Sequence, residues 1–224
     1  MDNQNDLEGL LRSKDALEQL VTRHFKGQKV KKKLPKQLEN EFWHFNIDRT
    51  RSNAIQFFGQ GVITYSIYVL LILPTNYHII RDSEHFAMDF AFSILSLYLV
   101  GMALFLFWVF ARFRVWRAHF YKASCTIMFF TIVSVSLLLL SVSNLVLQNQ
   151  AMLFIAFLYM LGFVLSGIKP FHMLWVGGVA ALTVIISLYA LNIPCDLLIL
   201  ARMFIGSMLL GFSMSVMLNT KERK

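Results

Sequence analysis

The stretch ALFLFWVFARFRVWRAHFYKASCTIMFFTIVSVSLLLL, residues 103–140, decides the fold of this chain. Two apolar segments flank a short basic loop, and neither segment contains an acidic or basic residue. A helix needs roughly 20 mostly apolar residues to cross the hydrocarbon core of a bilayer. Each flank reaches that length when it is followed away from the loop. The pattern therefore predicts two membrane-spanning helices joined by a basic turn.

Similar apolar segments recur from Asn53 almost to the end of the chain. Only 15% of the 224 residues are charged, against about 25% in average soluble domains. We therefore predict an all-α, polytopic membrane protein with six transmembrane helices, preceded by cytoplasmic amphipathic helices. The predicted spans are Ala54–Leu73, Met88–Phe110, Ala123–Leu145, Ala151–Ser166, Leu174–Leu191 and Leu197–Leu218. This divides the chain into an N-terminal region (1–53), a membrane domain (54–218) and the start of a cytoplasmic signalling helix (219–224).

Lys and Arg residues predict the orientation. Eleven precede Asn53, four lie in the loop of residues 111–122, and Lys169 and three tail residues fall on the same side. Only Arg81 and Arg202 lie toward the other side. Cytoplasmic loops are enriched in Lys and Arg, so both termini are predicted to be cytoplasmic. The net charge of +8 then reflects topology and attraction to anionic membrane lipids, and no nucleic-acid partner is predicted.

The N-terminal region begins with a predicted amphipathic helix over residues 6–25, whose leucines share one helical face. That face would pack on a partner, a second copy, the membrane or the rest of the chain. Six lysines follow within residues 26–36, a linker close to anionic headgroups.

A second amphipathic helix is predicted over residues 34–54, because Pro35 suits a helix start. Trp43, Arg49 and Arg51 are predicted to anchor it at the membrane interface, where Trp is favoured.

Candidate site residues gather toward the outer side. Asp89 and Arg202 are predicted at similar depth, and charged residues inside a membrane are costly and usually functional. We expect them to form a pair, which either locks two helices or lines an outward-facing ligand site; alternatively, Arg202 extends outward. His78 and His85 in the nearby loop complete the candidate sensing site. Their spacing is too weak a signal for a metal site, so no metal is predicted.

Enzyme signatures are absent from the sequence. It contains no HExxH, Cys-x-x-Cys, glycine-rich phosphate loop or serine nucleophile motif, so no catalytic residue and no cofactor are predicted. Cys125 and Cys195 are predicted on opposite sides of the membrane as unpaired thiols. A sensory or regulatory module is favoured over a small transporter or channel, which would show inverted repeats or broken helices, and over an intramembrane enzyme.

The last span contains small residues that allow close helix packing. Gly206, Gly211 and Ser215 are predicted to pack against a second copy, giving a homodimer, or inside one bundle. The chain then leaves the membrane as LNTKERK, residues 218–224.

The chain resembles the N-terminal membrane-associated sensor regions (MASE-like, six-span) of bacterial diguanylate cyclases, known as GGDEF proteins. Similar regions occur in some class III adenylate cyclases. The matching residues are Leu34-Pro35, Glu41-Phe42, Arg49 and Arg51 before the first span, and Glu222-Arg223 after the last, so the resemblance covers about residues 34–224.

The resemblance implies a sensor module in a bacterial inner membrane, dimeric through its last helix, that controls a cyclase domain in the same polypeptide. The output would be cyclic-di-GMP signalling or, alternatively, cyclic AMP. No GGDEF-type loop and no set of cyclase carboxylates occurs here, so the chain is expected to be either the sensor half of a longer protein, with the cyclase domain beyond Lys224, or a free-standing relative.

Overall fold

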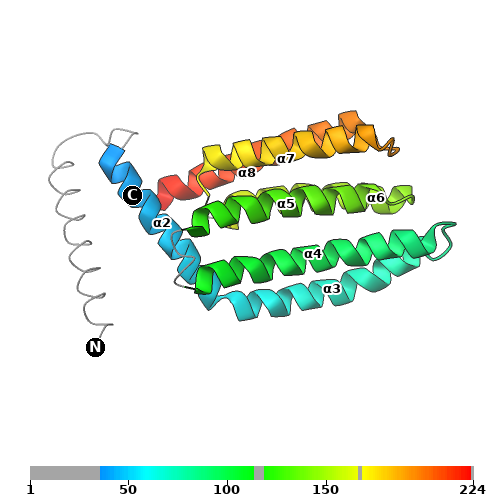
Figure 1. The fold of residues 1–224 in the computed structure, drawn as a ribbon, viewed down its shortest axis with the longest axis horizontal. Helices are drawn as coiled ribbons and strands as arrows, with labels where there is room; N and C mark the ends of the chain where they lie inside the picture. Colours follow the sequence, from blue (N-terminus) through cyan, green and yellow to red (C-terminus); the bar gives the residue numbers. More distant parts are fainter. Residues whose placement is uncertain (1–35, 114–118, 166–167, 223–224) are drawn as a thin grey trace. The chain divides into compact units, whose positions relative to one another are not determined.

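A computed structural model of the chain describes residues 36–113, 119–165 and 168–222, and these residues contain helices but no strand (Figure 1). The helices are α2 (Lys36–Gln56), α3 (Phe58–Ile80), α4 (Phe86–Arg112), α5 (Phe120–Leu140), α6 (Leu145–Leu165), α7 (Pro170–Ala190) and α8 (Leu197–Glu222). The all-α prediction is confirmed for these residues. The helix predicted over residues 6–25 and the linker up to residue 35 lie outside them.

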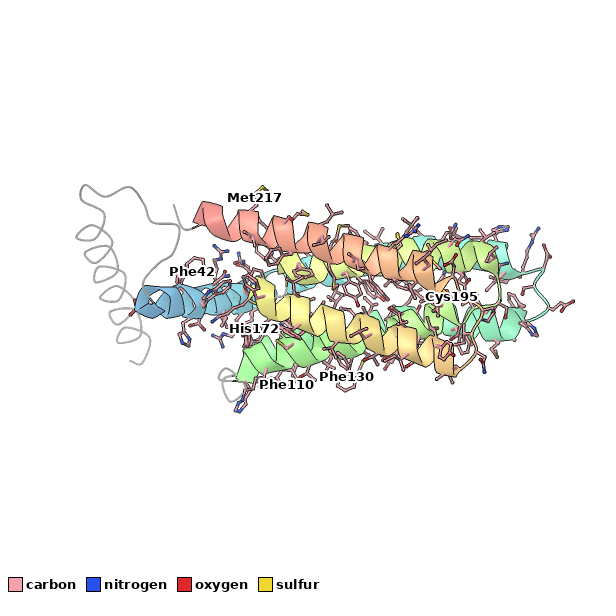
Figure 2. All side chains as sticks on the ribbon, turned by 90° about the horizontal axis from the view of Figure 1, so that it is seen from above. Phe42, Phe110, Phe130, His172, Cys195 and Met217 are labelled. Carbon is pink, nitrogen blue, oxygen red and sulfur yellow. The ribbon has the colours of Figure 1, made fainter. Side chains whose placement is uncertain are left out.

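Six of these helices, α3 to α8, are long and apolar enough to cross a membrane. Many large apolar side chains project outward from them, as the stick view shows (Figure 2). A soluble protein rarely exposes a large apolar surface, whereas lipid-facing helices must. The chain therefore has the composition and helix lengths of a multi-pass membrane protein.

By its internal contacts the chain divides into two units, Met1–Phe42 and Trp43–Lys224. In the first, the described residues are the opening turns of α2. The second holds the rest of α2 and the six long helices. The helix predicted over residues 34–54 is confirmed as α2, but its apolar side chains are spread around the helix rather than gathered on one face. Near its middle, Trp43 and Asn46 are buried while Phe45 is exposed.

The six helices run side by side (Figure 1). The starts of α3, α5 and α7 and the ends of α4 and α6 lie at one end (Figure 1), here called the α2 end. The α3–α4, α5–α6 and α7–α8 loops lie at the other, the distal end. Helix α5 contacts α4, α6 and α7, and α6 packs along α8, whereas α3 rests mainly on α4. The bundle thus consists of a four-helix part, α5–α8, with the α3–α4 pair at its side.

The main core lies among α5, α6, α7 and α8. Tyr159 of α6 is fully buried at its centre, where its hydroxyl donates to the carbonyl oxygen of Gly177 at 3.1 Å. Its ring lies 5.1 Å from that of Phe204 in α8. A smaller cluster around Val100 and Val135 joins α4 to α5. Tight packing is therefore concentrated in the four-helix part.

Helix boundaries differ from the predicted spans where side chains cap the helices. Helix α5 ends at Leu140 and α6 begins at Leu145, because the side-chain oxygen of Asn144 accepts from the N–H groups of Val146 (3.0 Å) and Leu147 (3.1 Å). Such N-caps satisfy the free N–H groups of a first turn.

Two further helix boundaries have different causes. Asp196 caps α8 in the same way as Asn144 caps α6. Helix α3 contains Pro74 and continues to Ile80, whereas the predicted span ends at Leu73.

Helix α7 ends in a Schellman motif. The N–H of Ile193 donates to the carbonyl of Leu188 at 3.1 Å, and the N–H of Asn192 to that of Tyr189 at 3.2 Å. Asn192 has φ 51°, the left-handed conformation that this motif requires and that Asn tolerates better than most residues.

Candidate functional site

Asp89 is an acidic side chain that the helices bury completely, in the first turn of α4. One carboxyl oxygen accepts a hydrogen bond from the backbone N–H of Ser143 at 2.9 Å. The other accepts from the hydroxyl of Ser83 at 3.4 Å. Ser83 belongs to the α3–α4 loop and Ser143 to the α5–α6 loop, so Asp89 ties two loops together. Its place at a helix N-terminus also favours an acidic group.

Arg202 does not pair with Asp89, so this part of the sequence prediction is wrong. Arg202 lies in the second turn of α8 with an exposed side chain, and no ion pair joins the two residues, both of which the structure describes. Asp89 accepts hydrogen bonds from two neutral donors instead. It lies in α4, whereas α8 packs against α6 and α7. The exposed Arg202 side chain fits the alternative prediction that it extends outward, because its long aliphatic part lets the charge reach polar surroundings.

The two histidines of the candidate site are exposed. His78 lies in the last turn of α3, and His85 precedes the first turn of α4. The backbone N–H of His85 donates to the Ser83 hydroxyl at 3.4 Å, which places it beside a partner of Asp89. Among the described residues, no hydrogen bond or ion pair links the side chains of the four predicted site residues, and no cluster of three His, Cys, Asp or Glu side chains is placed to hold a metal.

Two amide side chains, which the sequence analysis did not single out, hold the distal end together. Asn144 caps α6 and also donates through Nδ2 to the carbonyl of Ile79 at the end of α3, at 3.3 Å. Gln148 is buried in the first turn of α6. Its Nε2 donates to the carbonyl of Leu140 at 2.8 Å and to that of Pro194 at 3.1 Å. Gln148 therefore connects the end of α5, the start of α6 and the loop that enters α8.

A third set of polar groups lies one to two turns deeper. The amide of Asn76 in α3 donates to the hydroxyl of Ser93 in α4 at 2.6 Å, and the Ser96 hydroxyl donates to the Ser93 carbonyl at 2.7 Å. All three residues are buried. Polar groups that bond across helices hold membrane bundles together, so this set attaches α3 to α4.

A cleft with about 50 Å³ of free volume lies beside this set, lined by residues of α3, α4, α5 and α6 that include Asn76, Ser96 and Gln150. Tyr68 and Phe154 stack at its side with ring centroids 5.8 Å apart. Pockets for drug-sized ligands measure roughly 300–1,000 Å³. The cleft therefore has room for a few water molecules or a very small ligand.

We call these residues the distal polar cluster, defined as Asn76, Ser83, Asp89, Ser93, Ser96, Ser143, Asn144 and Gln148. Asp89 alone was predicted from the sequence. Amides that interrupt an apolar stretch were the available signal for the rest, because a polar group in a bilayer needs a partner. The cluster can hold four helices and three loops in one arrangement, and its hydrogen bonds join structural elements.

The small residues of α8 fall into two groups. Gly211 is buried, and a Cβ atom built there would lie 2.6 Å from Cδ2 of Phe163 in α6. Ser215, one turn later, is also buried. A Cβ atom at Gly206 would have nothing within 4 Å. Packing inside one bundle thus accounts for Gly211 and Ser215, and Gly206 is the member of this set left facing open space.

The three predicted interface anchors all lie in α2. Trp43 is only 7% exposed and has the ammonium group of Lys169 5.6 Å from its ring centre, so its contacts are with the protein. Arg49 is exposed and lies 3.5 Å from the side-chain oxygen of Asn46. Arg51 donates to the carbonyl of Ala111 at 3.4 Å, which ties α2 to the end of α4. Anchoring in lipid remains a prediction for the two arginines.

Comparisons with known proteins assign no family. Searches against protein-family models, curated proteins and solved structures found no match to this chain.

Proposed function

We propose that this chain is a membrane-embedded sensory or regulatory module that controls a nucleotide cyclase domain following it in the same polypeptide. A diguanylate cyclase is the first choice and an adenylate cyclase the second. The proposal rests on the sequence resemblance described above, on the six apolar helices, and on one feature of the distal polar cluster.

That feature is Gln148, which carries the proposal. Its two hydrogen bonds join the end of α5 to Pro194, two residues before Asp196 caps α8. Asp89 holds the α5–α6 loop from α4. Asp89 is therefore connected to the start of α8 through these hydrogen bonds and a few residues of the α5–α6 loop, so a rearrangement around Asp89 can reach α8.

Helix α8 provides the output in this proposal. It runs for 26 residues without a break, about 39 Å at 1.5 Å per residue, which exceeds the roughly 30 Å of a hydrocarbon core. Its last turns therefore extend past the apolar part of the span, where an output domain would be joined. A ligand or a change in the bilayer would alter the distal polar cluster, and α8 would shift or rotate. The signal acts only through its different affinity for the two arrangements.

A dimer through α8 is part of the proposal. Gly211 already packs against α6 and Ser215 is buried, so the face available to a second copy contains Gly206 and the exposed Ser213.

The first test is the mass of the native polypeptide in membranes of its source cell, measured with peptide identification. A mass well above 25.9 kDa, with peptides of a cyclase domain, is the expected result. A native mass equal to that of this chain would reject control of a cyclase in the same polypeptide.

The second test uses the full-length native protein in membranes, with the rate of cyclic nucleotide synthesis as readout. Gln148→Leu removes two hydrogen bonds of about 1 kcal/mol each, so we expect a roughly 5- to 30-fold change in the balance of the two output states. Gln150→Leu makes the same chemical change two residues along α6, where the side chain lines the cleft instead. Equal effects of the two variants, or none, would remove Gln148 from the signal route.

The alternative of a small transporter or channel is tested in proteoliposomes. Solute flux that depends on the purified chain, together with an unchanged cyclase rate in both variants, would favour transport.

A further inference from the structure

The α2 end of the bundle brings two arginines into one region. Nη1 of Arg51 donates to the carbonyl oxygen of Ala111 at 3.4 Å. Ala111 is buried in the last turn of α4, and Arg112 follows it with an exposed side chain. The contact therefore fixes the Arg51 side chain next to the backbone from which Arg112 extends.

Arg51 has a donor that the described residues leave unused. Its Nε–H is buried and has no hydrogen-bond partner there. Oδ1 of Asp48 lies 4.0 Å from this nitrogen, which is too far for a hydrogen bond, and no other described carboxyl group comes within that distance of Arg51. Buried donors nearly always have an acceptor, and the guanidinium fork matches the geometry of a phosphate group. Protein atoms cover the Nε nitrogen, but the Arg51 side chain keeps 19% of its surface exposed, so an acceptor from outside the described chain can bind the outer part of the guanidinium group.

Aromatic rings mark the depth of this region. Trp108, one turn before Arg112, stacks on Phe58 with ring centroids 4.7 Å apart, and Phe105 lies 6.0 Å from Trp108 on the same helix. Trp side chains are enriched where hydrocarbon gives way to headgroups. The two arginines thus lie just beyond an aromatic surface, at the end of a helix long enough to cross a membrane.

We propose that Arg51 and Arg112 bind the phosphate group of one anionic phospholipid, whose acyl chains lie along Phe58 and Trp108. The phosphate oxygens would accept from the exposed part of the Arg51 guanidinium group and from Arg112. We commit to a lipid because the aromatic surface next to the arginines suits acyl chains, and basic pockets between transmembrane helices on the cytoplasmic side are known to hold such headgroups. This site is independent of the cyclase proposed above.

The test is native mass spectrometry of the purified chain from detergent micelles containing equal amounts of phosphatidylglycerol and phosphatidylcholine. We expect one tightly retained phosphatidylglycerol on the unaltered chain. Arg51→Gln should lower its retention roughly tenfold or more, because hydrogen bonds to charged groups are lost. Arg51→Lys keeps the charge but loses the fork, so retention should fall to an intermediate level.

Lys122→Gln is the matched control, because it removes one positive charge from an exposed residue at the same end of the bundle. We expect it to leave retention unchanged. Arg112→Gln should reduce retention like Arg51→Gln, and it keeps the test valid if the Arg51 variant fails to fold.

Three results would overturn the proposal. Equal retention of the two lipids would show that no anionic site exists. An equal loss in Lys122→Gln and Arg51→Gln would indicate diffuse attraction between charges. Displacement of phosphatidylglycerol by millimolar inorganic phosphate would identify a free phosphate, rather than a lipid, as the occupant.

Discussion

Gly211→Ala should destabilise the bundle, although alanine is the better helix former. The new methyl group would lie 2.6 Å from Cδ2, 3.0 Å from Cγ and 3.1 Å from Cβ of Phe163. Contacts with Cβ and Cγ cannot be relieved by moving the tip of a side chain, and Phe163 is only 2% exposed. Helix α8 would therefore have to move away from α6.

The magnitude follows from two opposing effects. Replacing Gly by Ala inside a helix contributes about 1 kcal/mol of stability, whereas overpacking a core costs about 1–3 kcal/mol. Because the clash involves the root of a buried ring, we take the upper end of that range and expect a net loss of about 1–2 kcal/mol. Gly206→Ala is the matched control in the same helix. It meets nothing within 4 Å, so it should stabilise the chain by about 0.5–1 kcal/mol.

The assay is equilibrium unfolding of the purified chain in mixed micelles, followed by circular dichroism as the denaturing detergent fraction rises. A double-mutant cycle with Phe163→Ala isolates the contact. In that background the methyl group has room, and Gly211→Ala should become neutral or stabilising. The reasoning is refuted if Gly211→Ala is as stable as Gly206→Ala, or if the effects of Gly211→Ala and Phe163→Ala simply add.

Three further predictions concern the distal end. Asp89→Leu should cost about 1–3 kcal/mol in the same unfolding assay, because the N–H of Ser143 loses its acceptor, while Asp89→Asn keeps an acceptor and should cost less. Asn192→Val should cost about 1–2 kcal/mol because its φ of 51° is strained for a β-branched residue, whereas Asn192→Gly should be at least as stable as the unaltered chain. Burial, and secondarily the charge of Asp196, raises the pKa of the Cys195 thiol. Its alkylation by a maleimide near pH 7.5 should therefore be slower than in the denatured chain once the other cysteine is replaced, and should reach half its maximum at a higher pH; equal rates would contradict this.

The number of spans was predictable because bilayer thickness sets the length of an apolar segment. All six predicted segments overlap a helix that can cross a membrane. Their ends were less predictable. Gln148 and its polar neighbours read as a loop in an apolar sequence, yet they form the first turns of α6 because Asn144 caps that helix. A cap adds fixed hydrogen bonds that a hydropathy average does not register.

The candidate site was predictable only for its most costly residue. Asp89 drew attention because a buried acid in a membrane needs a partner, but the sequence does not say which one. Opposite charge favoured Arg202, whereas the structure supplies a backbone N–H and a hydroxyl from two loops. Such partners cannot be read from residue types, because every loop contains N–H groups and only the fold brings one of them to Asp89.

Helix α6 limits the motions that a signal can use. Its Tyr159 packs on Phe204 of α8, and its Phe163 packs on Gly211 of α8 two turns further along. Closely packed surfaces of this kind rearrange between discrete states rather than deform gradually. Helices α6 and α8 should therefore move together. Helix α4 packs closely along α5, whereas α3 and α4 meet α6 and the loop before it at few points, chiefly the apolar cluster around Val100 and the distal hydrogen bonds. A signal that loosens Asp89 would act where the α3–α4 pair meets α6, so a spin-label pair between α4 and α6 should change its distance more than a pair between α6 and α8.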